Sequence, residues 1–322
     1  MIIRPRILRQ SDAVRRMVQE TTLSPDDFIV PLFIDEGENS KEEISSMPNY
    51  HRLSLDLTIK EVKELWAMGL KTVLLFVKVP DVLKDNYGKE ALNTEGLMQR
   101  SIRAIKQAVP EMTVMTDVAL DPYSSYGHDG VVENFKIVND KSVEILAKMA
   151  ISHARAGADF VAPSDMMDGR IGAIRHALES QSLHNTGILA YSAKYASCFY
   201  GPFRDALDSA PGFGDKKTYQ MNPANRLEAL REVQLDITEG ADIVMVKPAL
   251  SYLDVIREVK NAVHVPVAAY QVSGEYAMVK AAAKMGWLDE DKAKMEILTS
   301  IKRAGADVIA TYFAKDAVRL LG

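Results

Sequence analysis

The 322-residue sequence predicts an α/β protein, a (β/α)8 (TIM) barrel with an N-terminal arm. Three observations predict this fold: eight short apolar runs, helix-like stretches between them, and a Gly-Ala-Asp tripeptide that recurs where a helix should give way to a strand. Strands of a parallel sheet are buried on both faces, so they appear as nearly continuous apolar runs. Eight such strands alternating with helices suit one closed barrel.

The predicted strands share an apolar interior and a turn or helix signal at their ends. They are expected at residues 28–34, 71–77, 112–118, 159–164, 187–193, 242–247, 265–271 and 307–312. The helices expected between them include residues 59–68, 94–108, 142–156, 224–239, 253–263 and 289–304. Asn222 followed by Pro223 is a favourable N-cap and first helical residue, which predicts the start of the fourth of these helices.

The Gly-Ala-Asp tripeptide marks the junction between helix and strand. It begins at Gly157, Gly240 and Gly305, and Gly69 takes a similar place before the second strand. Glycine adopts the left-handed conformation that ends many helices, so the repeat indicates a recurring helix–strand unit. A doubly wound open sheet is the rival fold. Its dinucleotide-binding version is disfavoured because no Gly-x-Gly-x-x-Gly follows the first strand.

The chain is expected to form one domain. Residues 28–322 contain no linker or low-complexity stretch and are assigned to the catalytic barrel. Residues 1–27 form an arm that is rich in arginine but also carries apolar side chains. The arm is as well explained by docking on a neighbouring subunit as by a solvated basic tail. Asp12 and Glu20 interrupt the pattern of a transit peptide.

Composition excludes several classes of protein. The net charge is −5, whereas a nucleic-acid-binding protein would show a basic excess. The single cysteine, Cys198, cannot form an internal disulfide or a cysteine-rich zinc site, and it fits a reducing cytoplasm. No apolar run is long enough to span a bilayer, and the first ten residues lack the apolar stretch of a signal peptide.

Polar side chains gather at the predicted ends of the strands. Active sites of these barrels lie at the carboxyl ends of the strands, so these side chains should converge on one mouth. They are Asp117, Ser164, Asp165, Lys194, Lys247, Ser273, Glu275 and Tyr312.

Two of these residues, Lys194 and Lys247, end adjacent predicted strands. Burial disfavours the charged form of an amine, and a second ammonium nearby disfavours it further, so the pKa of Lys247 should be lowered. A neutral amine can attack a ketone and form a Schiff base. A single lysine at a strand end is more often a surface or salt-bridged residue. Two on neighbouring strands favour the catalytic interpretation.

Two long loops flank this mouth. The first, at about residues 197–222, is rich in Gly, Pro and charge, and a loop of this length is typical of a lid. Its cations Arg204, Lys216 and Lys217 could grip a carboxylate, although a solvated charged loop is an equal alternative. The second, residues 117–130, carries three aspartates and His128. It could bind Mg²⁺ or be a cluster of Asp/Gly turns.

At this point the sequence resembles a known family. The segments YSAKYASCFYGPFRDA (191–206), MVKPALSYLD (245–254), YQVSGEYAM (270–278) and RAGAD (303–307) resemble porphobilinogen synthase, also called 5-aminolaevulinate dehydratase. The similarity runs from Arg4 to the final strand and so covers essentially the whole chain. It implies a lyase that condenses two molecules of 5-aminolaevulinate to porphobilinogen, with loss of two waters, in tetrapyrrole (haem and chlorophyll) biosynthesis. It also implies a homo-oligomer, usually an octamer, in which the arms embrace neighbouring subunits.

The resemblance also assigns roles to matching residues. Lys247 would form the Schiff base with the first substrate, whose carboxylate Ser273 and Tyr312 would bind. Lys194 would hold the second substrate. The residues implied around the carboxylate of the second substrate are Arg204, Lys216 and Gln220 of the lid, and Tyr200 is a further substrate-binding residue. Those implied to orient the amino groups and help proton transfer are Asp117, Ser164 and Asp165.

The chain departs from part of the family in its metal-binding residues. Zinc-dependent members carry three cysteines where this sequence has Ala119, Asp121 and Asp129. Without thiolates an active-site zinc is not expected, and the sequence resembles the aspartate-rich, zinc-independent branch. Glu232 matches the carboxylate that binds an allosteric Mg²⁺ in that branch. Many relatives also have arginine in place of Lys216, and lysine lacks the bidentate fork of arginine.

Three other functions compete with this interpretation. A class I aldolase needs one lysine, so the pair Lys194 and Lys247 argues against it. A non-catalytic binding barrel should have lost a lysine or the cations of the lid, and none is lost. A divalent-metal hydrolase built on residues 117–129 would leave both lysines unexplained.

Overall fold

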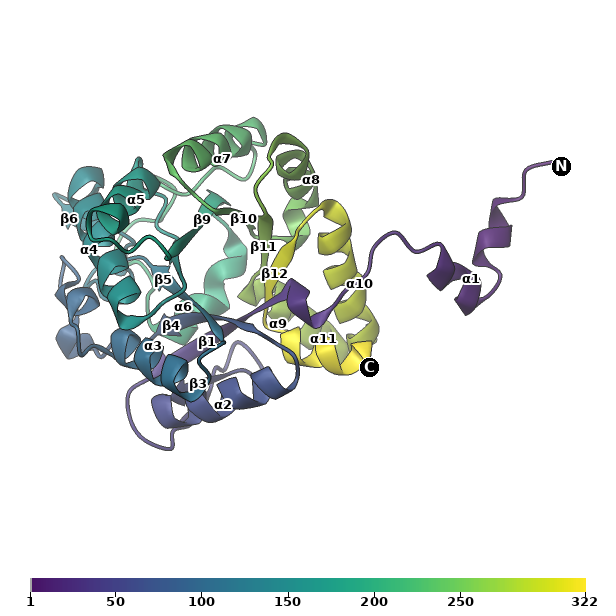
Figure 1. Ribbon diagram of the computed structural model, residues 1–322, viewed down its shortest axis with the longest axis horizontal. Coiled ribbons are helices and arrows are strands. Elements are labelled where there is room, and N and C mark those ends of the chain that lie inside the picture. The colour runs from purple at the N-terminus through teal and green to yellow at the C-terminus, as the bar shows by residue number, and fades with distance from the viewer. Residues whose placement is uncertain (1) are drawn as a thin grey trace.

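The structure, a computed structural model, describes residues 2–322 and contains a closed barrel of eight parallel strands (Figure 1). In order around the barrel the strands are β1 (Phe28–Asp35), β4 (Thr72–Val77), β5 (Thr113–Val118), β8 (Phe160–Pro163), β9 (Gly187–Lys194), β10 (Ile243–Lys247), β11 (Val267–Gln271) and β12 (Val308–Thr311). Pairing of β12 with β1 closes the sheet. The predicted (β/α)8 barrel is confirmed, and each strand lies within two residues of its predicted bounds.

Helices surround the barrel and connect its strands. They are α2 (Leu55–Ala67), α3 (Leu97–Ala108), α4 (Asn139–Ala156), α5 (Arg170–Ser180), α7 (Leu227–Glu239), α8 (Leu253–Ala262), α9 (Ser273–Lys284), α10 (Glu290–Ala304) and α11 (Ala314–Leu321). The six predicted helices are all present. The helix α5 is not among the predicted ones, although Ile171, Ile174 and Leu178 give it a buried stripe at helical spacing. The helices α9 and α11 are not predicted either.

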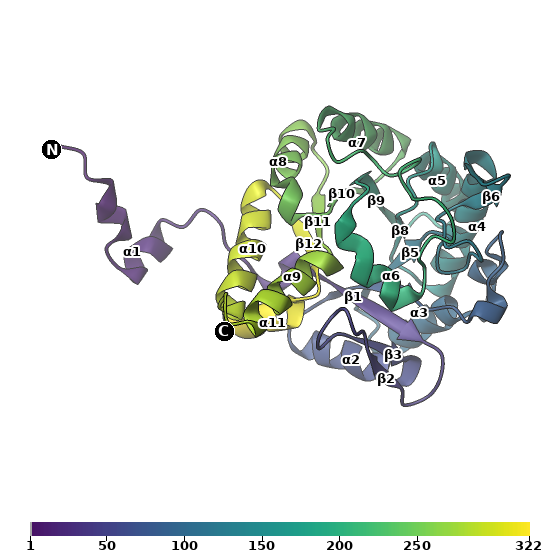
Figure 2. The same cartoon turned by 180° about the vertical axis from the view of Figure 1, so that it is seen from behind.

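The remaining elements are short. Those outside the barrel are α1 (Asp12–Met17), α6 (Gly201–Leu207), β2 (Lys41–Glu43), β3 (His51–Ser54), β6 (Val131–Glu133) and β7 (Lys136–Val138). The segment predicted as an irregular lid therefore contains a helix, α6, preceded by the 3-10 turn η5 (Cys198–Tyr200). Seen from behind, α6 lies across one end of the barrel (Figure 2).

The predicted start of the helix after the lid is wrong. Asn222 does not cap a helix; its side-chain oxygen accepts from the Ala224 N–H at 3.0 Å, and its carbonyl accepts from the Asn225 N–H at 2.9 Å. Such local bonds offer the backbone a turn in place of a helix. The helix α7 begins only at Leu227.

The Gly-Ala-Asp repeat has the predicted role and a second one. Gly157, Gly240 and Gly305 have φ of +108°, +108° and +124° and end their helices. Each following aspartate accepts a hydrogen bond from the first part of the preceding barrel strand. Asp159 accepts from the Val114 N–H at 2.8 Å, for example, and pairs with Lys106 at 3.0 Å. The equivalent bonds are Asp242 with Ile188 and Asp307 with Val267, both at 2.7 Å.

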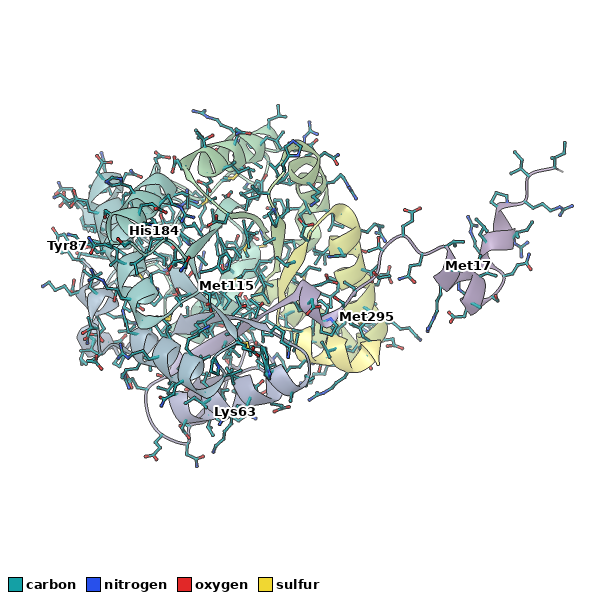
Figure 3. The ribbon with its side chains drawn as sticks, viewed as in Figure 1. Met17, Lys63, Tyr87, Met115, His184 and Met295 are labelled. Carbon is teal, nitrogen blue, oxygen red and sulfur yellow. The ribbon has the colours of Figure 1, made fainter. Side chains whose placement is uncertain are left out.

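Side chains pack tightly inside the barrel, whereas those of the N-terminal arm are largely exposed. Met115 of β5, labelled in Figure 3, is buried, with 4% exposed. It lies two residues before Asp117 and therefore on the same side of the strand. The arm projects away from the barrel, and its Met17 is 75% exposed (Figure 3). None of the side chains of α1 is buried. Within residues 2–322, no helix is long and apolar enough to cross a membrane.

Candidate active site

Lys194 and Lys247 lie side by side at the carboxyl ends of β9 and β10. They are direct partners in the parallel ladder between these strands. Both are buried, with 6% and 5% of their surface exposed. Because partners in a ladder project to the same face of the sheet, both amines extend toward the same mouth of the barrel.

Lys247 lies in an aromatic pocket. Its Nζ is between 4.4 and 5.3 Å from the ring centres of Tyr270, Tyr191, Phe203 and Tyr200. No carboxylate of residues 2–322 forms an ion pair with it. Burial, and then the charge of Lys194, lower the pKa of Lys247 to about 7. A substantial fraction of this amine is therefore neutral near pH 7, as nucleophilic attack on a carbonyl requires.

Lys194 is held differently. Its Nζ donates a hydrogen bond to the Ser164 carbonyl and lies 3.6 Å from the Asp129 carboxylate. Lys194 is thus anchored by an acceptor and an opposite charge, whereas Lys247 is surrounded by rings. The two neighbouring amines therefore differ in environment.

Asp117, at the end of β5, faces the same mouth. Its Oδ1 accepts a hydrogen bond from the Ser164 hydroxyl at 2.7 Å. Burial, and then the charge of Asp121, raise the pKa of Asp117 to about 7. A carboxyl group with such a pKa can both give and take a proton near neutral pH, which suits a general acid–base.

Lys216 of the lid reaches two aspartates of the loop that follows β5. Its Nζ lies 3.2 Å from Asp121 and 2.9 Å from Asp129. Burial opposes ionisation of Asp129, but the ammoniums of Lys216 and Lys194 hold its pKa well below the usual range. This donor set has no thiolate and already surrounds a cation, so it does not fit zinc. The lone thiol, on Cys198, is exposed.

These side chains enclose one small cavity. Its lining is Asp117, Asp121, Asp129, Ser164, Lys194, Tyr200, Phe203, Arg204, Lys216, Gln220 and Lys247. Its volume of about 30 Å³ has room for only a few water molecules. The buried Oε1 of Gln220 has no hydrogen-bond partner among the described residues. Substrates larger than water can therefore enter only if the lid moves.

Three predicted substrate-binding residues do not line this cavity. Asp165 instead accepts from the Met167 N–H at 2.7 Å and lies 3.7 Å from Arg170. The Ser273 hydroxyl accepts from the Phe203 N–H at 2.9 Å, so the lid itself occupies it. Tyr312 bonds to Tyr270 at 2.9 Å and borders a separate cavity.

Glu232, on α7, lies in a second and larger cavity beside the lid. That cavity has a volume of about 910 Å³, and Asp168 and Glu228 also line it. Burial raises the pKa of Glu232, Arg170 lowers it, and nearby carboxylates raise it further. Within residues 2–322, no group of three or more His, Cys, Asp or Glu side chains forms a ready-made metal site. Glu232 alone fits Mg²⁺ only if the ion keeps most of its waters.

The aromatic pocket around Lys247 is not among the features predicted from the sequence. Tyr191 and Tyr270 fall within apolar strand runs, and Phe203 directly precedes Arg204 in the lid. Their signal was weak because strand aromatics usually pack in a core. Only closure of the barrel brings β9, β11 and the lid around one amine. The fold and the site together define a (β/α)8 barrel protein with two buried lysines side by side at its mouth.

Comparison with known proteins gives the particular family. The family model described as Delta-aminolevulinic acid dehydratase matches residues 2–320. The chain belongs to this family and is a lyase, as the resemblance indicated. The dehydratase of Halalkalibacterium halodurans is 54% identical over 318 residues, which cover 99% of this chain and 96% of that one. The chloroplastic enzyme of Physcomitrium patens is 57% identical over 323 residues, which cover 100% and 74%.

A solved structure agrees with the whole fold. The Toxoplasma gondii delta-aminolevulinic acid dehydratase (porphobilinogen synthase), in complex with the reaction product porphobilinogen, has a TM-score of 0.98. It is 52% identical and covers 99% of this chain and 92% of its own. The barrel described above is therefore the family's own architecture.

Proposed function

We propose that this protein condenses two molecules of 5-aminolaevulinate to porphobilinogen, releasing two waters, in tetrapyrrole biosynthesis. The observation that carries the proposal is the ladder pairing of Lys194 with Lys247, because it brings two amines to one mouth. A reaction that joins two ketone substrates can use one amine for each. Family membership supports the same substrate.

Lys247 takes the first substrate. Its neutral amine adds to the ketone carbon, and loss of one water leaves a Schiff base. Asp117 and the Ser164 hydroxyl, bonded at 2.7 Å, move protons during this step. The rings of Tyr191 and Phe203 keep water away from the amine.

Lys194 takes the second substrate. Before the lid opens, Asp129 and the Ser164 carbonyl hold the amine of Lys194 in place. Arg204 and Gln220 bind the carboxylate of this substrate. Arg204 is the principal cation, because two aspartates already neutralise Lys216. Ser273 and Tyr312 bind the carboxylate of the first substrate once the lid releases Ser273.

Magnesium acts away from the chemistry. Glu232 would hold a largely hydrated Mg²⁺, whose charge would offset the neighbouring Asp168 and Glu228 carboxylates. Bound there, the ion supplies charge neutralisation beside the lid. No zinc is assigned to the active site, because Lys216 binds Asp121 and Asp129.

Assembly and location complete the proposal. The bare apolar side chains of the arm, such as Ile2 and Met17, support docking on a neighbouring subunit in a homo-octamer. A single exposed cysteine supports a cytoplasmic enzyme. The net charge of −5 argues against nucleic-acid binding.

The test traps the imine. The protein is mixed with 5-aminolaevulinate, reduced with borohydride and digested, and the peptides are mapped by mass spectrometry. We expect an adduct on Lys247, with or without one on Lys194, and none when substrate is omitted. A folded protein that gives no adduct would overturn the assignment. Formation of porphobilinogen, measured in parallel, separates this reaction from that of a single-lysine aldolase.

A further inference from the structure

The lid is fastened to the loop that follows β5. The Gly212 N–H of the lid donates to the Tyr126 carbonyl of this loop at 2.9 Å. Gly127 has φ of +63°, and a Cβ atom there would collide with the Ala210 carbonyl oxygen. The two segments thus approach each other too closely for a side chain between them.

His128 lies in the middle of this contact. It is buried, with 1% exposed, although it belongs to a loop. Its Nε2 lies 3.0 Å from the Phe213 carbonyl oxygen and its Nδ1 lies 3.1 Å from the Tyr219 hydroxyl. Its ring packs on the Phe213 ring, with centroids 4.6 Å apart.

The neutral imidazole satisfies both bonds. With its proton on Nε2 it donates to the carbonyl of Phe213 and accepts from the hydroxyl of Tyr219 at Nδ1. Burial lowers the pKa of His128, which supports the neutral form. The Tyr219 oxygen can in turn accept from the Asp129 N–H, 3.4 Å away.

Tyr219 connects this contact to the active site. It sits in a turn in which the Gln220 N–H donates to the Lys216 carbonyl at 2.9 Å. Lys216 and Gln220 both line the catalytic cavity, whereas His128 does not. A residue outside the cavity therefore sets the position of two residues within it.

We propose that His128 is a positioning residue that clamps the lid shut through Phe213 and Tyr219, and so places Lys216 and Gln220 over the substrate. The inference rests on the proposed function for its consequence in catalysis. The clamp itself is independent of the reaction. His128 lies outside the catalytic cavity and contributes no proton to the chemistry.

Two measurements on the full-length protein test the clamp. The first is steady-state kinetics with 5-aminolaevulinate, and the second is the rate of tryptic cleavage after Lys217 in the lid, which needs no activity. The variants are His128→Ala, which loses both bonds, and His128→Gln, whose amide can donate to one partner and accept from the other. Tyr219→Phe removes the hydroxyl, and with it the bond to His128 and the longer one from the Asp129 N–H. His184→Ala removes an exposed histidine on the outside of the barrel (Figure 3) and is the matched control.

We expect His128→Ala to raise KM about tenfold with a smaller change in kcat, and to speed cleavage by a similar factor, because cleavage follows the open population. Tyr219→Phe should change both by about threefold to fivefold. His128→Gln and His184→Ala should resemble the parent. Parental KM and cleavage rate in His128→Ala would overturn the clamp. So would a raised KM in His128→Ala with a parental cleavage rate, since the lid would then stay closed without the imidazole. If no variant acts on 5-aminolaevulinate, the cleavage rates still test the clamp alone.

Discussion

Lys194 and Lys247 are direct partners in the β9–β10 ladder, yet their environments differ. Lys194 lies 3.6 Å from Asp129, whereas Lys247 is surrounded by aromatic rings. Burial and the neighbouring charge disfavour a proton on Lys247, and an anion and a carbonyl hold Lys194. One strand pair thus places two amines in different electrostatic environments.

Lys247→Met should abolish porphobilinogen formation and the borohydride adduct while keeping the fold. In the parent, adduct formation should weaken as pH falls below about 7, because the protonated amine is not a nucleophile. The measurement is adduct yield against pH, with circular dichroism to verify folding. Full activity in this variant would contradict the role of Lys247.

The same variant should change how stability depends on pH. An unfolded lysine keeps its proton up to about pH 10.4, but the folded one releases it near 7. Between these values the unfolded state binds more protons, so the parent's free energy of unfolding should rise with pH. Lys247→Met should therefore be more stable than the parent at pH 7, with the advantage shrinking toward pH 10. Urea unfolding at several pH values measures this, and a constant difference would count against the lowered pKa.

Lys194→Met should move the pH dependence at Lys247. Removing a neighbouring positive charge favours protonation of Lys247 and raises its pKa. Borohydride trapping on Lys247 should then require a higher pH than in the parent. Porphobilinogen formation should be lost. A trapping profile that does not move would show that the two amines are not electrostatically coupled.

Lys216→Gln should destabilise the fold by about 3–5 kcal/mol, because it leaves two buried carboxylates without their shared partner. Adding Asp121→Asn should recover part of the loss, since Asp129 keeps Lys194. Lys217→Gln changes the exposed neighbour and should shift stability by less than about 0.5 kcal/mol. Urea denaturation of the four proteins gives the comparison. Equal stability of Lys216→Gln and the parent would show that these ion pairs contribute little to the stability of the fold.

Glu232→Gln should weaken Mg²⁺ binding measured by calorimetry and remove any stimulation of activity by Mg²⁺. A zinc chelator should leave the parent active, since the donor set does not fit zinc. Glu228→Gln, in the same cavity, is the matched control, and its Mg²⁺ affinity should be closer to that of the parent than the affinity of Glu232→Gln is. Unchanged Mg²⁺ binding in Glu232→Gln would exclude this carboxylate as the ligand.

Deletion of residues 1–20 should reduce the assembly below an octamer and leave the barrel folded. Of residues 2–20, none belongs to the buried residues of the barrel core, and Asp27 keeps its ion pair with Lys302 at 2.8 Å. Analytical ultracentrifugation measures the mass, and circular dichroism verifies the fold. An unchanged mass would show that the arm makes no required subunit contact.

The fold could be read from the sequence because its signals are local. Buried parallel strands need apolar runs, and a helix that turns back to the sheet needs a left-handed residue, as at Gly157 and Gly240. Helix starts were less predictable. At Asn222 a side chain can cap a helix or close a turn with nearly the same local bonds, and the surrounding chain decides which forms.

The sequence by itself determined the barrel, the two lysines at its mouth and the family, because strand ends of a parallel barrel converge by construction. Only the tertiary structure decided which groups surround each amine. Asp129 contacts Lys194 and Lys216, and Tyr270 packs against Lys247. In each contact the two residues are far apart along the chain. Ser273 and Tyr312 follow β11 and β12 as predicted, but only the tertiary structure shows that their hydroxyls bond to the lid backbone and to Tyr270. Contacts between distant segments depend on how loops close over the barrel, and no local pattern encodes that geometry.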